Sequence, residues 1–315
     1  MRTSSSGRAL RLRAHAFAAF AAVGVVRLAE RDALAQACCS GAATLAPGRL
    51  GPAEFALVGV QAKAGWVHGA YGNRGAYAGS GSGAHEADLE QSVVGTVRVA
   101  RRGQLSLLVP FAETWRTTPA TGSEVGAGLG DLALSGRYDF ILAGTRAAPG
   151  VALLAGVTAP TGRSADTSTR PLATDATGTS VWQAAMGLAI EQSFGPWLPA
   201  IAVTGALRAP RMLGAIDSQL GPQVSAAASL GYAFFGAGAV GASLAYSWEA
   251  DASANAVPVS WSGRQLLRGS VSGMRALGET WRLQGTFYGD LPVDHLGQNY
   301  HASIGLTLGV MRSFL

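Results

Sequence analysis

The chain has 315 residues, of which 24 are Lys or Arg and 19 are Asp or Glu, giving a formal net charge of +5. Residues 1–35 contain six arginines and two acids, so this segment carries +4 of that charge. The remaining chain is therefore nearly neutral, and only 14% of all residues are charged. This distribution argues against a basic surface for binding nucleic acid.

The first 37 residues have the pattern of a secretory signal peptide. Four arginines precede an apolar run over residues 14–26, and small residues follow at positions 33, 35 and 37. This run is too short for a membrane-spanning helix, which needs about 20 residues. A basic head, a short apolar middle and an A-x-A site predict export, with cleavage after Ala35 or Ala37.

A short segment over residues 38–52 separates this signal from the first β-rich run. It begins with Cys38 and Cys39, the only cysteines of the chain. Adjacent cysteines rarely form a disulfide with each other, and two of them without a nearby histidine make a poor metal site. A lipid anchor at Cys38 is one alternative. The favoured interpretation is a periplasmic N-terminal tail or plug segment, and we expect neither a metal nor a cofactor.

Residues 53–315 contain about twelve alternating or β-rich runs of roughly ten to fifteen residues, the length of a tilted membrane strand. In residues 127–141, for example, Leu134 and Tyr138 alternate with Ser135, Arg137 and Asp139. This period of two indicates a β-strand with two different faces. The predicted fold is an all-β, transmembrane, antiparallel up-and-down β-barrel of about 12 strands. The expected strands are 53–66, 88–100, 103–115, 127–141, 150–161, 180–194, 197–208, 222–234, 239–249, 265–275, 280–290 and 301–315.

Loop lengths and aromatic positions favour a membrane barrel over a soluble sandwich. Long polar connections, such as 67–87, 116–126 and 162–179, alternate with short ones, such as 101–102 and 195–196. Outer-membrane barrels have tight periplasmic turns and longer external loops. Nothing in the architecture of a soluble sandwich requires long and short loops to lie at opposite ends. Trp182 and Phe194 close the two ends of one outward face, as interfacial aromatic girdles do. We therefore expect an outer-membrane location.

The same alternation predicts which side chains line the lumen. Both acids and bases occur among them, so it indicates no strong ion selectivity. One interpretation is that Asp131, Arg137 and Asp139 simply pair across the wall, because buried charges need partners. The candidate lumen-lining residues are Arg98, Asp131, Ser135, Arg137, Asp139, Gln183, Glu191, Ser225, Ala227, Ser229, Ser243, Ala245, Arg268 and Arg282.

Two consecutive runs have unusually small residues on the face predicted to point inward. They carry Ser225, Ala227 and Ser229 on one strand and Ser243 and Ala245 on the next. A barrel of about twelve strands lies between filled eight-stranded and open sixteen-stranded barrels. These small residues leave room for a narrow pore, or for an inserted segment such as the 38–52 tail or an external loop. A neutral or weakly polar solute suits such a wall better than an ion.

No arrangement of residues indicates an enzyme. The histidines lie in the signal peptide and around the first and last long loops, and none is spaced to pair with a serine and an acid on one strand face. The glycine-rich stretch 126–130 lacks the following helix that a phosphate-binding turn requires. The remaining alternative is a structural or surface-recognition barrel that acts through its long loops.

Two short motifs resemble a known family. Gly128-Leu-Gly130-Asp131, followed by Arg137-Tyr138, and Pro160-Thr161-Gly162 are similar to the motifs of outer-membrane barrel transporters of the phenol-degradation (MetA-pathway) type. This resemblance implies a narrow channel for small neutral compounds, including aromatic or hydrophobic ones. The implied partners are the outer-membrane bilayer, the barrel assembly machinery and a small-molecule solute.

Overall fold

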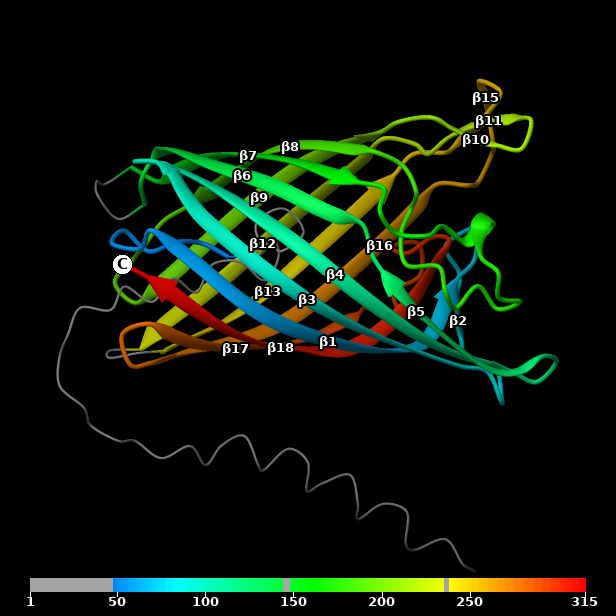
Figure 1. The fold of residues 1–315 in the computed structure, drawn as a ribbon, viewed down its shortest axis with the longest axis horizontal. Helices are drawn as coiled ribbons and strands as arrows, with labels where there is room; N and C mark the ends of the chain where they lie inside the picture. Colours follow the sequence, from blue (N-terminus) through cyan, green and yellow to red (C-terminus); the bar gives the residue numbers. More distant parts are fainter. Residues whose placement is uncertain (1–47, 144–147, 235–237) are drawn as a thin grey trace, which may run out of the picture.

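The computed structural model describes residues 48–143, 148–234 and 238–315. These residues form a closed barrel of twelve wall strands (Figure 1), each antiparallel to its neighbours, and β1 pairs with β18 to complete the ring. A closed ring has no free sheet edge, so its backbone groups are paired, as hydrocarbon surroundings require. The predicted fold class is confirmed. The wall strands are β1 (Ala56–Tyr71), β3 (His85–Ala100), β4 (Gly103–Thr118), β6 (Leu132–Ile141), β7 (Gly150–Ala159), β8 (Gln183–Glu191), β9 (Trp197–Arg208), β12 (Gln223–Phe234), β13 (Gly238–Glu249), β16 (Arg264–Leu277), β17 (Trp281–Asp290) and β18 (Tyr300–Phe314).

One predicted strand is interrupted. Residues 127–141 form the end of β5 (Gly122–Leu129) and then β6, and both pair with β4. Leu108 is opposite Ala133, and Phe111 is opposite Leu129. Between these two pairs β4 covers three residue steps, whereas the opposite segment covers four. The extra residue makes a β-bulge at Gly130 and Asp131. The prediction of one uninterrupted strand is therefore wrong at this point.

Several additional elements lie beyond one end of the wall (Figure 1). The predicted loop 116–126 is largely a continuation of the β4–β5 hairpin, and β2 (Tyr77–Gly79) pairs with β1. Two other loops contribute to a separate four-stranded sheet. Its strands are β10 (Arg211–Leu213), β11 (Ile216–Gln219), β14 (Ser253–Ala254) and β15 (Val257–Pro258). The short 3-10 helix η1 spans Ala165–Thr167, and no helix in the described ranges has the length and apolar character needed to cross a membrane.

Connections are sorted by length between the two ends of the barrel. Tight turns at 101–102 and 278–280 lie at the end that also holds the C-terminus (Figure 1), which we call the short-turn end. The opposite end, with the four-stranded sheet, is the long-loop end. The predicted signal peptide 1–37, Cys38 and Cys39 lie outside the described residues, as do 144–147 and 235–237.

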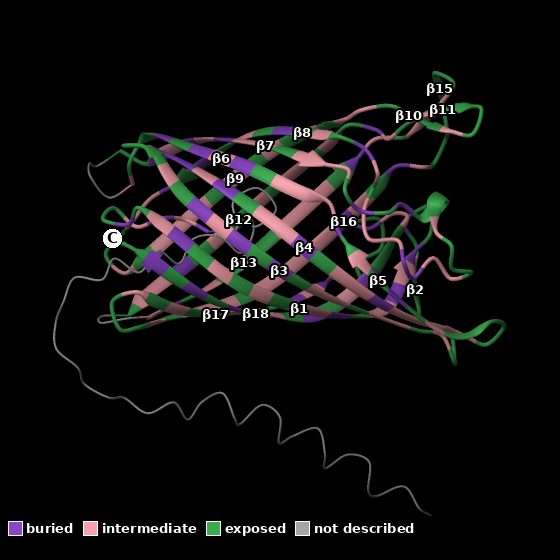
Figure 2. Ribbon diagram, in the orientation of Figure 1, coloured by how far each residue is buried: buried purple, intermediate pink, exposed green. Residues whose placement is uncertain are grey.

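The outer surface of the wall is apolar. Exposed and more buried residues alternate along the strands (Figure 2), and side chains such as Leu188 (53% exposed) and Leu308 (55% exposed) point away from the lumen. So many exposed apolar side chains are unfavourable in water, but they suit a lipid-facing wall.

Aromatic side chains form a belt around the short-turn end. Tyr138 meets Phe140 edge-on at 5.2 Å, and Tyr232 lies between Trp197 at 4.9 Å and Phe234 at 5.4 Å. These rings are amphipathic or apolar and favour the level of the lipid headgroups. Tyr138, one of the motif residues, therefore belongs to the outer belt and not to the lumen.

Candidate functional site: the barrel lumen

An unbroken row of five alanines crosses one side of the lumen. Cross-strand partners point to the same face of a sheet, and the chain neighbours Leu188 and Leu244 are exposed on the outer surface, so these alanines face inward. The row has one residue from each of five neighbouring strands: Ala152, Ala189, Ala202, Ala227 and Ala245.

This alanine row is a diagonal track through the barrel. It begins beside Asp139, which is paired with Ala152 near the short-turn end of β6. It ends beside Arg268, which is paired with Ala245 near the long-loop end of β16. Strands tilt in a barrel, so a row perpendicular to them climbs from one mouth toward the other. The neighbouring rows have short side chains over most of β8 to β13. These are Gly187, Thr204, Ser225 and Ser247 on one side, and Ala200, Ser229 and Ser243, which follow Glu191 of β8, on the other.

The opposite wall carries longer polar side chains. Tyr288 is one of them, and its ring centre lies 4.6 Å from the guanidinium of Arg268 and 5.7 Å from Nζ of Lys63. A β-carbon at Gly65 or Gly305 would lie 2.7 Å or 2.5 Å from Oη of Tyr288, so the tyrosine rests over two strands that have no side chain there. The lumen therefore has one wall of small side chains and one polar wall.

Four buried charges meet at the short-turn end. Arg137 donates to Asp139 at 2.8 Å and to Glu191 at 2.9 Å, and Arg49 contacts the same two carboxylates. All four side chains are at most 12% exposed, so each charge relies on the others for compensation. Pairing across the wall thus holds for Arg137 and Asp139. It does not extend to Asp131, which lies at the long-loop end.

Residues 48–54 lie inside this end of the barrel. The carbonyl of Gly48 accepts hydrogen bonds from Thr96 at 3.3 Å and from Gln104 at 3.0 Å. Arg98 donates to the carbonyls of Gly51 and Glu54, and the Glu54 carboxylate pairs with Arg282. Leu50 packs against Leu57 and Met311. Part of the predicted 38–52 tail is thus in contact with the lumen wall.

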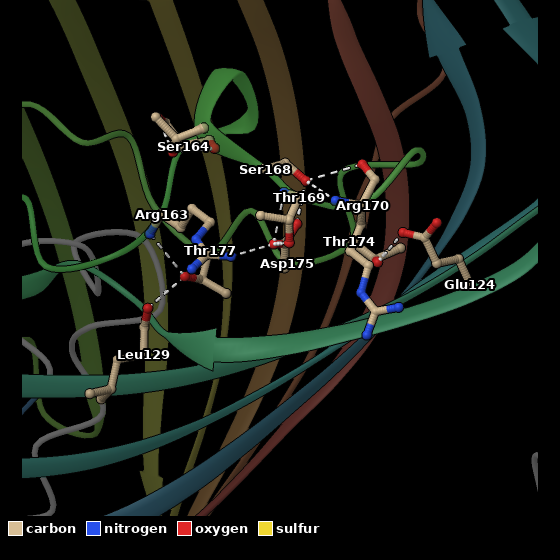
Figure 3. Close-up of polar contacts among 11 residues, drawn as sticks. Glu124, Leu129, Arg163, Ser164, Ser168, Thr169, Arg170, Thr174, Asp175 and Thr177 are labelled. Atoms are coloured by element: carbon tan, nitrogen blue, oxygen red, sulfur yellow. Dashed lines mark hydrogen bonds and ion pairs between the residues drawn. The ribbon is translucent and has the colours of Figure 1, made fainter.

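At the long-loop end, the β7–β8 loop lies on the inner face of β5. Gly126 pairs with the buried Thr114, and a β-carbon on Gly126 would lie 2.5 Å from the carbonyl carbon of Thr174. No larger residue fits beneath the loop backbone at that position. Glu124 accepts a hydrogen bond from Thr174 at 2.6 Å, and Thr177 donates to the carbonyl of Leu129 (Figure 3).

The two sequence motifs bind each other at this loop. Asp131, at the bulge, accepts hydrogen bonds from the backbone N–H of Gly162 at 2.9 Å and of Thr179 at 2.7 Å. Thr161 donates to the carbonyl of Gly130 at 2.7 Å and accepts from the N–H of Leu132 at 3.0 Å. These contacts fasten both ends of the loop to the same point of the wall.

Asp175 organises the middle of the same loop. Its carboxylate accepts hydrogen bonds from the Ser168 hydroxyl, from the backbone N–H of Thr169 at 3.1 Å and from Arg163 (Figure 3). The Ser168 bond is the main cause of a pKa of Asp175 that is well below the ordinary value of 3.8, followed by the Thr169 and Arg163 bonds. Asp175 therefore stays ionised and holds the loop at neutral pH.

The other candidate lumen residues are distributed along the wall. Ser135 is buried, Gln183 accepts a hydrogen bond from Arg208 at 2.9 Å, and Arg268 pairs with Asp290 at 2.6 Å. As contacts of a solute path, all of the candidate residues stay predictions. No group of three His, Cys, Asp or Glu side chains within the described ranges is placed to hold a metal ion.

Sequence reasoning missed several charges that shape the lumen. Arg208 pairs with Glu249 at 2.7 Å, and both side chains are less than 10% exposed. Both residues lie at inward positions of the alternation in β9 and β13, so that pattern contained the signal. Arg49 precedes the first expected strand, where no periodicity could indicate its position. Glu54 was included in the expected strand 53–66 but lies before β1 in the structure.

Comparisons with known proteins find solved structures of similar fold. No family model matches the chain, and no curated protein matches it. An outer membrane channel from Pseudomonas putida F1 is similar with a TM-score of 0.68 and 16% identity, covering 84% of this chain and 97% of that one. The β domain of the Bordetella autotransporter BrkA gives 0.44 and 14%, covering 82% and 99%. The monoaromatic hydrocarbon channel TodX, as a deletion mutant, gives 0.44 and 10%, covering 82% and 90%. At 16% identity the likeness to the Pseudomonas putida channel supports the barrel fold alone.

Proposed function

We propose that this protein is an outer-membrane channel for small neutral compounds, including aromatic or hydrophobic ones. The alanine track carries this proposal. It provides a strip of small, uncharged side chains that continues from one mouth toward the other. A solute that moves along it meets apolar methyl groups on one side and the hydroxyl and amide groups of the polar wall on the other.

The charges inside the barrel support a neutral solute. Arg268 pairs with Asp290, Arg208 with Glu249, and Lys63 lies 4.0 Å from Glu90. Opposite charges at such distances largely cancel each other's field, so the lumen offers no extended surface of one sign. Such a lumen selects more by size and polarity than by charge, and the proposed role is not enzymatic.

The proposed orientation places the short-turn end in the periplasm and the long loops outside. The signal peptide of residues 1–37 would direct export, and the barrel assembly machinery would insert residues 53–315 into the outer membrane. Tight turns face the periplasm in outer-membrane barrels of known structure, which is the basis for this orientation.

Two segments of the chain would control the width of the path. Residues 48–54 narrow the periplasmic mouth through the Arg49 ion pairs, which supports the role of the 38–52 segment as a plug. The β7–β8 loop narrows the external mouth, where it rests on Gly126. A solute then passes beside these segments, or passes when one of them moves away.

The test is to fill the alanine track. Ala227→Trp places a large side chain in the lumen, whereas the adjacent Ala228→Trp points outward, because Ala228 pairs with the exposed Ile201 and Leu244. We expect both variants to assemble, with single-channel conductance and liposome swelling by phenol reduced only for Ala227→Trp. Equal transport in the parent, Ala227→Trp and Ala228→Trp would contradict the proposal.

A second candidate function is surface recognition through the long loops. The four-stranded sheet beyond the barrel favours it, because Met212 (65% exposed) and Val257 (65% exposed) extend from that sheet. Deleting residues 210–219 separates the two functions. A channel should keep its conductance after this deletion, while a recognition barrel should lose its binding to the partner surface.

A further inference from the structure

Two arginines lie on the outer, lipid-facing surface at the short-turn end. Arg275 of β16 has the same orientation as the outward Val271, and Arg312 of β18 has that of the outward Val310. Both side chains are exposed. This position is unusual for charge, because the outer surface of the wall is otherwise apolar.

The two arginines flank one strand. Arg275 pairs with Leu283 and Arg312 pairs with Trp281, so the two arginines lie on the two strands that border β17, both on the outer face of the wall. Neighbouring strands are about 4.8 Å apart, so the backbones of β16 and β18, with β17 between them, are about 10 Å from each other. Two long side chains leaning toward β17 can therefore reach one anionic group between them.

Neither cation has an acidic partner in the described part of the chain. No Asp or Glu oxygen lies within 4.0 Å of either guanidinium there, whereas the lumen arginines at positions 49, 137, 208 and 268 are all paired. The guanidinium of Arg312 lies 5.7 Å from the ring centre of Trp281 and 5.3 Å from that of Phe314. These rings belong to the aromatic belt, so the guanidinium is held at the headgroup level.

We propose that Arg275 and Arg312 form a binding site for the phosphodiester of a phospholipid headgroup, with a preference for anionic phospholipids. At this depth on the outer wall, lipid headgroups are the anions that the two cations face. A guanidinium donates two parallel hydrogen bonds to phosphate oxygens, and a second positive charge favours a headgroup that carries net negative charge. Trp281 and Phe314 would contact the glycerol and upper acyl region. The site rests on the transmembrane fold and does not depend on transport.

Native mass spectrometry of the purified full chain tests this site. The protein is reconstituted in vesicles of phosphatidylethanolamine with a minority of phosphatidylglycerol, extracted, and analysed for retained lipid. We expect the parent protein to retain phosphatidylglycerol selectively, and Arg275→Gln/Arg312→Gln to lose about 30-fold of that preference, since each of the two interfacial arginines contributes about 1 kcal/mol.

The matched control removes two other exposed arginines at the same end. Arg101 and Arg102 lie in the β3–β4 turn, away from β17. Arg101→Gln/Arg102→Gln should keep the phosphatidylglycerol preference, and heat-modifiable gel migration verifies that both double variants are folded barrels. An equal loss in the two variants would mean diffuse attraction to the rim and overturn the site. A parent protein without lipid preference would overturn it too.

Discussion

Oδ1 of Asp131 accepts a hydrogen bond of 2.9 Å from the backbone N–H of Gly162, although the two residues are 31 positions apart in the chain. The extra residue of the β-bulge allows this contact. It sets the Asp131 carboxylate at the strand break, where it can receive the loop. A bulge that redirects one side chain is a recurrent device at barrel rims.

We expect Asp131→Ala to release the β7–β8 loop from the external mouth. The substitution leaves the N–H groups of Gly162 and Thr179 without their acceptor. For the buried Gly162 an unsatisfied donor costs about 1–3 kcal/mol, whereas the exposed Thr179 can donate to water. Limited trypsin digestion should cleave after Arg163 faster than in the parent, and open-channel conductance should rise. Asp217→Ala, in the four-stranded sheet, is the control and should change neither property.

Two glycines on the inner face of β5 offer a matched pair. A β-carbon at Gly126 would lie 2.5 Å from the Thr174 backbone, whereas one at Gly128 would lie 3.5 Å from Thr177, an ordinary contact distance. We therefore expect Gly126→Ala to displace the loop and Gly128→Ala to leave it in place. Hydrogen exchange of the loop amides measures the difference. Similar exchange in both variants would mean that the loop does not rest on this strand.

Two substitutions in the charge cluster at the short-turn end should have different effects, one mainly on the free energy of unfolding and the other mainly on conductance. Arg137→Ala leaves Asp139 and Glu191 buried on the wall with one fewer cation, and we expect the barrel to lose up to about 3–5 kcal/mol of unfolding free energy. Arg49→Ala loosens residues 48–54, and water can then reach the carboxylates. That variant should unfold nearer to the parent in urea but show a larger conductance. Identical effects of the two substitutions would contradict separate roles.

A charge on the outer wall should impair insertion far more than one in the lumen. Leu188→Arg places a cation near the middle of the bilayer, where it costs about 2–4 kcal/mol, while Leu188→Phe remains apolar. Ser229→Arg puts the same charge on the lumen side. Folding yield into vesicles should fall for Leu188→Arg alone. Comparable yields for all three variants would mean that water, and not lipid, covers that surface.

The order of the β7–β8 loop should depend on acid pH through Asp175. Because the pKa of this carboxyl is lower in the folded loop than its ordinary 3.8, ionised Asp175 contributes stability above about pH 4. That contribution is lost as the pH falls through the lowered pKa. Hydrogen exchange corrected for intrinsic rates should show constant protection between pH 7 and 5 and a decline below pH 4. Asp175→Asn should weaken protection at neutral pH and remove this decline, because the amide carries no charge at any pH.

The strands were predictable because each has a lipid face and a lumen face that differ at every second residue. Residues 197–208 were assigned to one strand and form β9 with the same bounds. The bulge at Gly130 and Asp131 was missed, because one extra residue shifts the alternation without ending the β-rich run. The extension of the β4–β5 hairpin was missed for another reason: its polar residues look like a loop when only hydrophobicity is considered.

The contacts inside the lumen could not be obtained from periodicity. Residues 48–54 have no regular secondary structure, and their location depends on partners such as Gln104 and Glu191 that are distant in sequence. The inward position of the β7–β8 loop likewise depends on Gly126, whose role appears only when a strand and a loop backbone are brought together. Alternation placed Ala227 and Ala245 on the inner face, but only the register joins them to Ala152, Ala189 and Ala202 in one track.

The closure between β1 and β18 also determines when this barrel can be completed. The two partners are the first and last strands that the structure describes, with Ala56 opposite Phe314 and Tyr71 opposite Tyr300. Before they meet, each presents a free strand edge that can pair with another chain. The ring therefore cannot close until β18 has been synthesised, and a chain that stops before this strand ends as an open sheet. Residues 48–54, directly before β1, must lie on the inner side when the last seam forms.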